Sequence, residues 1–456
     1  MTERTTAAER DIAHVLHPFT NLVQHKEKGP LVIDRGEGIY VYGEDGRQYI
    51  EGVAGLWCTA LGFNEEELVQ AATDQMRKLP YYHFFHSKAS MPGIDLAEKL
   101  KGIAPVPISK VFFVNSGSEA NDTVVKLVWY YNNARGRPQK KKFISRVNAY
   151  HGITLASTSL TGIAKVHAEF DLPLPQMMHT DFPYHYRNAK DGESEEAYAS
   201  RLADNLEQMI LREGPETVAA FIAEPVMGAG GAVIPPATYY DKIQAVLRRH
   251  DVLFIADEVI CGFGRTGNMW GCQTFSLKPD IITCAKALSS AYQPIAAVLI
   301  SDEIYQGVEE GSRKVGVFAH GFTYSGHPVA AAVALRTLEI YEERRLIDHV
   351  QAVSPRFLKR LAGLGEHPLV GNTRGVGLIG GIELVADKAT KKAFDPAQMV
   401  GPYISERCVE HGVILRNIEN NMAFCPPLII TEPQIDDLFD RFEQALDDTH
   451  KWVKRG

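Results

Sequence analysis

The sequence predicts an α/β protein with a large domain, whose mostly parallel sheet is covered by helices on both faces, and a smaller α+β domain. Two observations support this prediction. From about residue 90 apolar strand-like runs alternate with helical stripes, and after about residue 330 the pattern changes. Strands that are apolar along their whole length are typical of parallel sheets buried on both faces. We expect an N-terminal segment at 1–60 that joins the small domain, a large domain at 61–330 and the small domain at 331–456.

The N-terminal segment is expected to contain a β-hairpin. The runs at 38–42 and 47–50 are rich in strand-forming residues and flank Glu44-Asp45-Gly46. An Asp-Gly pair between two such runs is a strong hairpin signal. In the alternating part a predicted helix precedes a predicted strand three times. The helix at 94–104 precedes the strand at 110–114, the helix at 202–210 precedes the strand at 218–223, and the helix at 239–247 precedes the strand at 252–256.

In the C-terminal part the sequence predicts helices and strands in a different order. Two long helical stretches lead to a glycine-rich strand at 375–385, and a further helix precedes a strand that ends at Arg416. The last helix is amphipathic, because apolar side chains recur three and four residues apart along it. Those side chains are Ile435, Leu438, Phe439, Phe442 and Leu446.

The composition argues against several classes of protein. The formal net charge of -8 disfavours a nucleic-acid partner, since phosphate backbones are bound by clustered Lys and Arg. No apolar run of about 18 residues predicts a membrane span, and the stretch from Met1 to Asp11 lacks the apolar core of a signal peptide. The six cysteines are scattered without a C-x-x-C pair, which fits neither a zinc site nor a disulfide framework. We therefore expect a cytoplasmic protein without a metal site.

A possible anion site follows the strand at 110–114. Ser116 and Glu119 have the spacing of a capping box, so a helix should begin there. Gly117 would let the backbone approach a ligand, and the free amides of Gly117 and Ser118 would lie at the positive end of the helix dipole. An ordinary capped helix explains this motif equally well when it is taken alone.

Two charged residues follow later strands. Asp257 comes directly after the apolar run at 252–256, and Lys286 comes just past a short apolar strand that begins near Asp280. The carboxyl end of a buried strand is where α/β proteins place ligand contacts. Taken alone, the aspartate could equally cap a turn, and a lysine in such a place is usually a surface residue.

These three features are more specific together than apart, because the carboxyl ends of parallel strands converge on one edge of a sheet. Pyridoxal 5'-phosphate (PLP) needs partners of these kinds: an anion site for its phosphate, a carboxylate facing its pyridine nitrogen and an amine for its aldehyde. A carboxylate in a dry site keeps that nitrogen protonated, so that the ring can take up electrons. The sequence therefore predicts a PLP enzyme.

A glycine pattern at 262–267 needs a separate explanation. It matches the dinucleotide-binding fingerprint G-x-G-x-x-G after a strand. A true fingerprint opens a helix at once, whereas residues 268–272 carry no helical stripe. The pattern therefore does not predict a nucleotide site.

The whole chain resembles the class III (ω-type) aminotransferases of PLP fold type I. The most specific stretch is 253–267, followed by Lys286 at the family's usual distance. In finer detail the chain is similar to ω-amine:pyruvate aminotransferases at 55–58, 150–152 and 321–328. The resemblance implies a large domain with a seven-stranded, mostly parallel sheet, and a homodimer or a tetramer.

The resemblance also implies roles for individual residues. Lys286 would hold PLP as a Schiff base and later move a proton, while Asp257 would pair with the pyridine nitrogen. The phosphate would contact Ser116, Gly117 and Ser118, together with Phe322 and Thr323 from the partner subunit. Around the ring, the expected contacts are Tyr150, His151, Glu224 and Val259.

Several of these assignments have a structural alternative. Tyr150 could be a core aromatic residue, Glu224 a structural hydrogen-bond acceptor and His151 a packing residue. The chain also departs from the family pattern at Ala287 and Ala291, where glycine is common. Each adds a methyl group beside the expected cofactor site without removing a reacting group.

The resemblance suggests how substrates bind. Arg416 matches the arginine that binds the acceptor carboxylate, and its planar fork suits that task; the alternative is a surface ion pair. Phe19, Trp57 and Phe85 match positions that line the amine pocket, with Phe85 reaching across the dimer, although each could be a core residue. We expect a primary amine without an α-carboxylate as donor and pyruvate as acceptor, in two half reactions.

Two alternative functions remain: another PLP-dependent reaction, and a role without catalysis. The same fold supports aminomutases, decarboxylases and racemases, which product analysis would separate from an aminotransferase. A non-catalytic PLP-binding protein is a further alternative, although the presence of both Lys286 and Asp257 argues against it.

Overall fold

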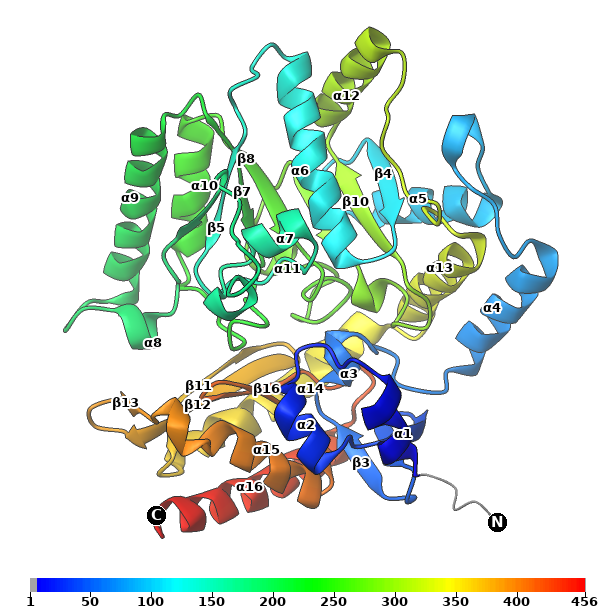
Figure 1. Cartoon of the computed structure of the whole chain (residues 1–456). Helices are drawn as coiled ribbons and strands as arrows, with labels where there is room; N and C mark the ends of the chain where they lie inside the picture. The colour runs from blue at the N-terminus through cyan, green and yellow to red at the C-terminus, as the bar shows by residue number, and fades with distance from the viewer. Residues whose placement is uncertain (1–5, 456) are drawn as a thin grey trace.

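The computed structural model describes residues 6–455. Figure 1 shows a central sheet with its helices in the upper half of the molecule, and segments from both ends of the chain packed together below it. The predicted unit boundaries at residues 60 and 330 stay predictions, and the ends of the outer units, residues 1–5 and 456, lie outside the described part.

The central sheet has seven strands in the order β4-β10-β9-β8-β7-β5-β6. Neighbouring strands are parallel except at β10, which runs antiparallel to both β4 and β9. The predicted seven-stranded, mostly parallel sheet is therefore confirmed. In chain order the strands are β4 (Lys110–Val114), β5 (Lys142–Arg146), β6 (Met177–Thr180), β7 (Val218–Ala223), β8 (Leu253–Asp257), β9 (Ile281–Cys284) and β10 (Ala296–Ile300).

Helices cover both faces of this sheet. All six residues of β7 are buried, and successive residues face opposite sides, as a strand requires. Phe221 packs with apolar residues of α9 and α10, whereas Ile222 packs with those of α6 and α12. The longer helices of this half are α4 (Glu66–Lys78), α5 (Met91–Ile103), α6 (Gly117–Ala134), α9 (Glu195–Glu213), α10 (Tyr239–Arg249), α12 (Asp302–Val315) and α13 (Pro328–Glu343).

The lower half contains a second sheet and three long helices. Its strand order is β11-β12-β16-β15, and β13 pairs with β12. The predicted amphipathic last helix is α16, whose five predicted apolar side chains are all buried. The elements are α14 (Leu346–Gly363), β11 (Val370–Val376), β12 (Ile379–Asp387), β13 (Lys392–Ala393), α15 (Val400–Glu410), β15 (Arg416–Ile418), β16 (Asn421–Phe424) and α16 (Glu432–Val453).

Two details of the predicted C-terminal strands are wrong. The run at 375–385 is not one strand but the end of β11, a turn and most of β12, because Gly377 has a φ of +57° and reverses the chain. A Cβ at this glycine would lie 2.5 Å from the carbonyl oxygen of Arg265. Arg416 begins β15 rather than ending a strand, since the chain leaves β14 (Val413–Ile414) at Leu415 and enters the other sheet.

The predicted N-terminal hairpin is present and joins the lower half. It consists of β2 (Tyr40–Gly43) and β3 (Gln48–Glu51), with β1 (Ile33–Glu37) added beside β2. β3 also pairs in parallel with β14, so residues from the two ends of the chain share one sheet. The remaining short helices are α1 (Ala7–His14), α2 (Leu22–Lys28), α3 (Ala54–Trp57), α7 (Leu155–Leu160), α8 (His185–Asn188) and α11 (Gly271–Thr274).

Two further observations concern membrane-spanning helices and the glycine pattern at 262–267. Within residues 6–455, none of the helices combines the length and the apolar character needed to cross a bilayer. The glycine pattern at 262–267 forms turns, and the next helix, α11, begins only at Gly271. The pattern therefore lacks the helix that a dinucleotide fingerprint opens.

Candidate active site

A cavity lies where the parallel strands end. Residues at the ends of β4, β5, β7, β8 and β9 line it, and they include the three features expected to converge, namely the helix start at Gly117, Asp257 and Lys286. Most of the predicted cofactor-binding residues of this chain are among them. The lining residues are Gly117, Ser118, Asn121, Tyr150, His151, Gly152, Glu224, Asp257, Val259, Ile260, Ala285 and Lys286.

The carboxylate of Asp257 is buried and held from both sides. Its Oδ2 accepts a hydrogen bond from Asn121 Nδ2 at 2.9 Å and lies 2.8 Å from His151 Nδ1. Its Oδ1 accepts from the backbone amide of Val259 at 3.1 Å. These contacts fix the orientation of the carboxylate at the end of β8, where it can face a bound ring.

Asn121 was missed in the sequence. It lies one turn into α6, four residues after Gly117, and therefore on the helix face that points to the cavity. Its amide nitrogen also donates to the carbonyl oxygen of His151 at 2.6 Å. That i, i+4 spacing from the predicted anion site is the signal that could have identified it.

Glu258 has a different role from its neighbour Asp257. Side chains alternate along a strand, so Glu258 points away from Asp257. Its carboxylate accepts backbone hydrogen bonds from Gly271 at 2.9 Å and Cys272 at 2.6 Å, at the start of α11. Burial raises the pKa of Glu258 to about 7. Glu258 therefore holds the start of α11, and it does not line the cavity.

The predicted anion site forms at the start of α6. Ser116 is the N-cap, and its Oγ accepts from the amide of Glu119 at 3.2 Å. The other half of the predicted capping box is wrong, because the Glu119 carboxylate instead accepts from the amide of Asn115 at 2.7 Å. A Cβ at Gly117 would lie 3.1 Å from the side chain of Val259, so glycine keeps this corner open.

Tyr150 and His151 lie on the loop after β5, and Glu224 holds that loop. The Glu224 carboxylate accepts from the amide of Tyr150 at 3.1 Å and from that of Gly228 at 3.0 Å. Burial raises the pKa of Glu224, and the nearby His151 partly opposes this. These contacts agree with the structural reading of Glu224. Among the described residues, His151 Nε2 is buried without a hydrogen-bond partner.

Lys286 projects into the cavity just after β9. Its φ is +50°, a left-handed conformation that a side chain makes costly. The surrounding structure supports it, since the hydroxyl of Tyr341 donates to the carbonyl oxygen of Ala287 at 2.6 Å. Of the two departures from the family pattern, Ala291 has a φ of +63°, whereas Ala287 is not among the positive-φ residues. Only Ala291 therefore adds a methyl group in a region that favours glycine.

A second, larger cavity adjoins the first through Tyr150. Phe19, Tyr150 and Arg416 line it, and the rings of Phe19 and Tyr150 lie 6.5 Å apart. Arg416 makes no ion pair within residues 6–455, and its Nε is buried without a partner. Burial lowers the pKa of Arg416. The alternative, a surface ion pair, therefore has no partner within the described residues of this chain.

The other predicted substrate and cofactor contacts lie elsewhere. Trp57 is buried in the main hydrophobic core, which agrees with its structural alternative. Phe85 is 41% exposed and packs against Gly321, next to Phe322 and Thr323. Phe85, Phe322 and Thr323 do not line the Lys286 cavity of their own chain.

Comparisons with known proteins agree with this geometry. The sequence model of the family described as "Aminotransferase class-III" matches residues 22–446. The chain belongs to the class III aminotransferases. It is therefore a transaminase of PLP fold type I, and PLP is its cofactor.

Individual relatives of this class III aminotransferase are similar over nearly its whole length. A tomato (Solanum lycopersicum) protein named gamma aminobutyrate transaminase 3, chloroplastic, is 51% identical over 96% of the chain and 85% of that protein. The crystal structure of the omega transaminase from Pseudomonas jessenii in complex with PMP is 56% identical and has a TM-score of 0.98, covering 99% and 100%. A structure described as a transaminase with L-ala is 55% identical, with a TM-score of 0.92, covering 93% and 100%.

The residues of the inner cavity fit PLP. The helix start offers free amides to a phosphate, a buried carboxylate lies at the end of β8, and a lysine lies at the end of β9. The carboxylate of Asp257 is held in a fixed orientation by Asn121 and His151.

Proposed function

We propose that this aminotransferase moves an amino group from the primary amine of an ω-amine, a diamine or a β- or ω-amino acid to pyruvate. The observation that carries the proposal is the position of Arg416. Its unpartnered guanidinium lies beside Tyr150, which lines both the outer and the inner cavity. A bound carboxylate would supply the partner that this half-buried cation lacks within residues 6–455.

The deep residues would perform the chemistry. PLP supplies an electron-poor ring that takes up the electrons released when a substrate carbon loses its proton. Asp257, fixed by Asn121 and His151, would face the pyridine nitrogen with its negative charge. The amine of Lys286 would bind the cofactor at rest and, once displaced by a substrate amine, move the proton at the substrate carbon.

Arg416 gives a reason for the substrate pair. Pyruvate carries a carboxylate next to its keto group, and its amination product is alanine. One similar structure is described as a transaminase with L-ala, and several relatives are named for γ-aminobutyrate. Both compounds carry one carboxylate and one amine, so a single guanidinium can bind either of them in its own half reaction.

We also propose a homodimer, either free or paired into a tetramer, in which Phe322, Thr323 and Phe85 reach the partner's cavity. The support is their position: Phe85 is exposed and packs on Gly321, and the hydroxyl of Tyr81 donates to the carbonyl oxygen of Thr323 at 2.9 Å. These residues thus lie together, and none of them lines the Lys286 cavity of its own chain. Sedimentation of the holoenzyme would test this, and a monomer that keeps full activity would contradict it.

We propose the cytoplasm as the compartment. The support is that all six cysteines are free, and five of them are buried. Disulfides are rare where thiols are kept reduced.

The test of the proposed function is a donor panel at fixed pyruvate. We expect alanine to form from amines without an α-carboxylate, including γ-aminobutyrate. Activity confined to α-amino acids would contradict the donor assignment. Consumption of the amine without formation of alanine from pyruvate would point instead to an aminomutase or a decarboxylase.

A further inference from the structure

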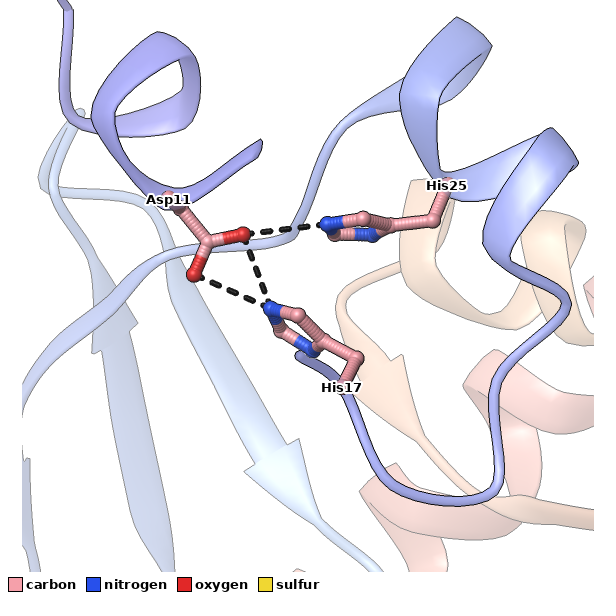
Figure 2. Close-up of side chains that lie close together, drawn as sticks. All are labelled: Asp11, His17 and His25. Carbon is pink, nitrogen blue, oxygen red and sulfur yellow. Dashed lines mark hydrogen bonds and ion pairs between the residues drawn. The ribbon is translucent and has the colours of Figure 1, made fainter. Parts of the chain in front are cut away.

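A cluster of metal-ligating side chains lies near the N-terminus, outside both cavities. Asp11 lies on α1, His25 lies on α2, and His17 lies on the connection between these helices. In Figure 2 the two imidazole rings point their nitrogens at the same carboxylate. The PLP chemistry described above uses none of these side chains.

The geometry of the cluster is compact. His17 Nε2 lies 3.0 and 2.8 Å from the two Asp11 oxygens, and His25 Nε2 lies 3.1 Å from Oδ2. The two rings lie 4.1 Å apart, and the three potential ligand atoms are all within 4.8 Å of one another. Two imidazoles and one carboxylate therefore converge on one point.

We propose that Asp11, His17 and His25 form a binding site for a divalent transition-metal ion, with Zn²⁺ the best match. Zinc binds imidazole nitrogen and carboxylate oxygen at about 2.0–2.2 Å, so its tetrahedral ligands lie about 3.3 Å from each other. The observed separations of 2.8 and 3.1 Å need to open by only a few tenths of an ångström. Each Nε2 would give up its hydrogen bond to Asp11 and bind the ion through its lone pair, with its proton moved to Nδ1 or released to water. The carboxylate of Asp11 would bind the same ion.

The burial of the cluster leaves room for a fourth ligand. The side chains of Asp11, His17 and His25 are 21%, 27% and 9% exposed. An ion held by three protein ligands therefore keeps a position open to water, the ligand count that catalytic zinc sites share. A fully enclosed four-ligand site would be structural, and this cluster is not of that kind.

The site would act on the loop that carries Phe19. His17 is two residues from Phe19, whose φ is +50° and whose ring lies 6.5 Å from that of Tyr150. An ion joining α1, the connection and α2 would fix this loop at the rim of the outer cavity. This consequence rests on the proposed function, whereas the metal site itself does not.

Titration of the tag-free holoenzyme with Zn²⁺ against a chromophoric chelator tests the site. We expect one equivalent to bind, and His17→Gln and His25→Gln each to weaken that binding at least about 10- to 100-fold, since even outer-sphere partners of a metal are worth that much. His14→Gln, an exposed position on α1, is the matched control and should bind like the parent. Circular dichroism would establish that all variants are folded.

A second measurement uses Co²⁺, which reports its own ligands. We expect a visible d–d absorption band in the parent and the His14→Gln variant, and its loss in both cluster variants. Zinc binding that is absent in the parent, or equal in the cluster and control variants, would overturn the proposal. These titrations contain no amine donor, so their result is independent of whether the donor and acceptor are assigned correctly.

Discussion

The inner cavity holds its two carboxylates with several hydrogen bonds, whereas the guanidinium of the outer cavity has no partner within residues 6–455. At the inner end, Asp257 makes three contacts and Glu224 accepts two backbone hydrogen bonds. At the outer end, Phe19 is 67% exposed and the Nε of Arg416 is unpartnered. The inner end is fixed before any substrate arrives, whereas the outer end is left for a substrate to complete.

This difference suggests a division of labour. Rigid, buried groups suit a reaction step that requires one geometry. A half-open rim with a single cation suits the alternation between two substrates that ping-pong half reactions require. Changes at the inner end should therefore lower the rate of every reaction, and changes at the outer end should alter the choice of substrate.

Removal of the amine at the inner end should have the largest effect. For Lys286→Ala we expect kcat to fall by at least about 10⁴-fold, because both the anchor of the cofactor and the proton carrier are lost. Alanine formation from pyruvate measures this. A variant with near-parental kcat would show that a different residue carries the proton.

Neutralising the carboxylate should have the next largest effect. We expect Asp257→Asn to lower kcat about 10²- to 10³-fold, or about 3–4 kcal/mol in the barrier, since the amide cannot stabilise a charged ring nitrogen. Glu258→Gln is the matched control, because that side chain faces the start of α11 and should leave kcat nearly unchanged. Equal losses in the two variants would contradict the assignment.

The buried acid below the site should make stability depend on pH. Burial raises the pKa of Glu258 from its ordinary value of 4.5 to about 7. Between these values the folded protein keeps a proton that the unfolded chain releases, so the free energy of unfolding falls as pH rises, by about 3 kcal/mol in all. Glu258→Gln should remove this contribution. The Tm of the variant minus that of the parent should therefore increase from about pH 5 to about pH 8. A difference in Tm that stays the same over this range would refute the role of burial.

A change at the outer end should affect binding more than chemistry. For Arg416→Ala we expect the KM for pyruvate to rise about 10- to 100-fold, the loss of about 1.5–3 kcal/mol in charge-assisted hydrogen bonds. The half reaction with an amine that has no carboxylate should keep its rate. Arg416→Lys retains the charge without the planar fork, so its KM for pyruvate should lie between those of the parent and of Arg416→Ala. A fall in kcat for every donor would mean that Arg416 belongs to the inner end.

Much of the fold could be predicted because its signals are local. The strands at 110–114 and 218–223 have the predicted bounds, since each is a short apolar run between polar turns. The strand that was to end at Arg416 could not be predicted correctly, because the chain changes sheets at Leu415, and that change depends on distant pairing with β3.

The site was partly predictable for the same reason. Asp257 and Lys286 follow recognisable strands, so their convergence could be inferred. Asn121 was not found, because its only signal is the i, i+4 spacing from Gly117, and an amide at such a spacing is common inside helices. The cluster of Asp11, His17 and His25 was not predicted, because its members lie on α1, on α2 and on the connection between them, and only the turn of the chain there brings them together. Binding of an ion there would contradict the expectation of no metal site.

Reduction of the holoenzyme with borohydride, followed by peptide mapping, tests the central claim most directly. Borohydride makes the bond between PLP and its lysine permanent, so the modified peptide identifies the anchoring residue. We predict that the label lies on Lys286 alone. A label on any other lysine, with Lys286 unmodified, would contradict the account.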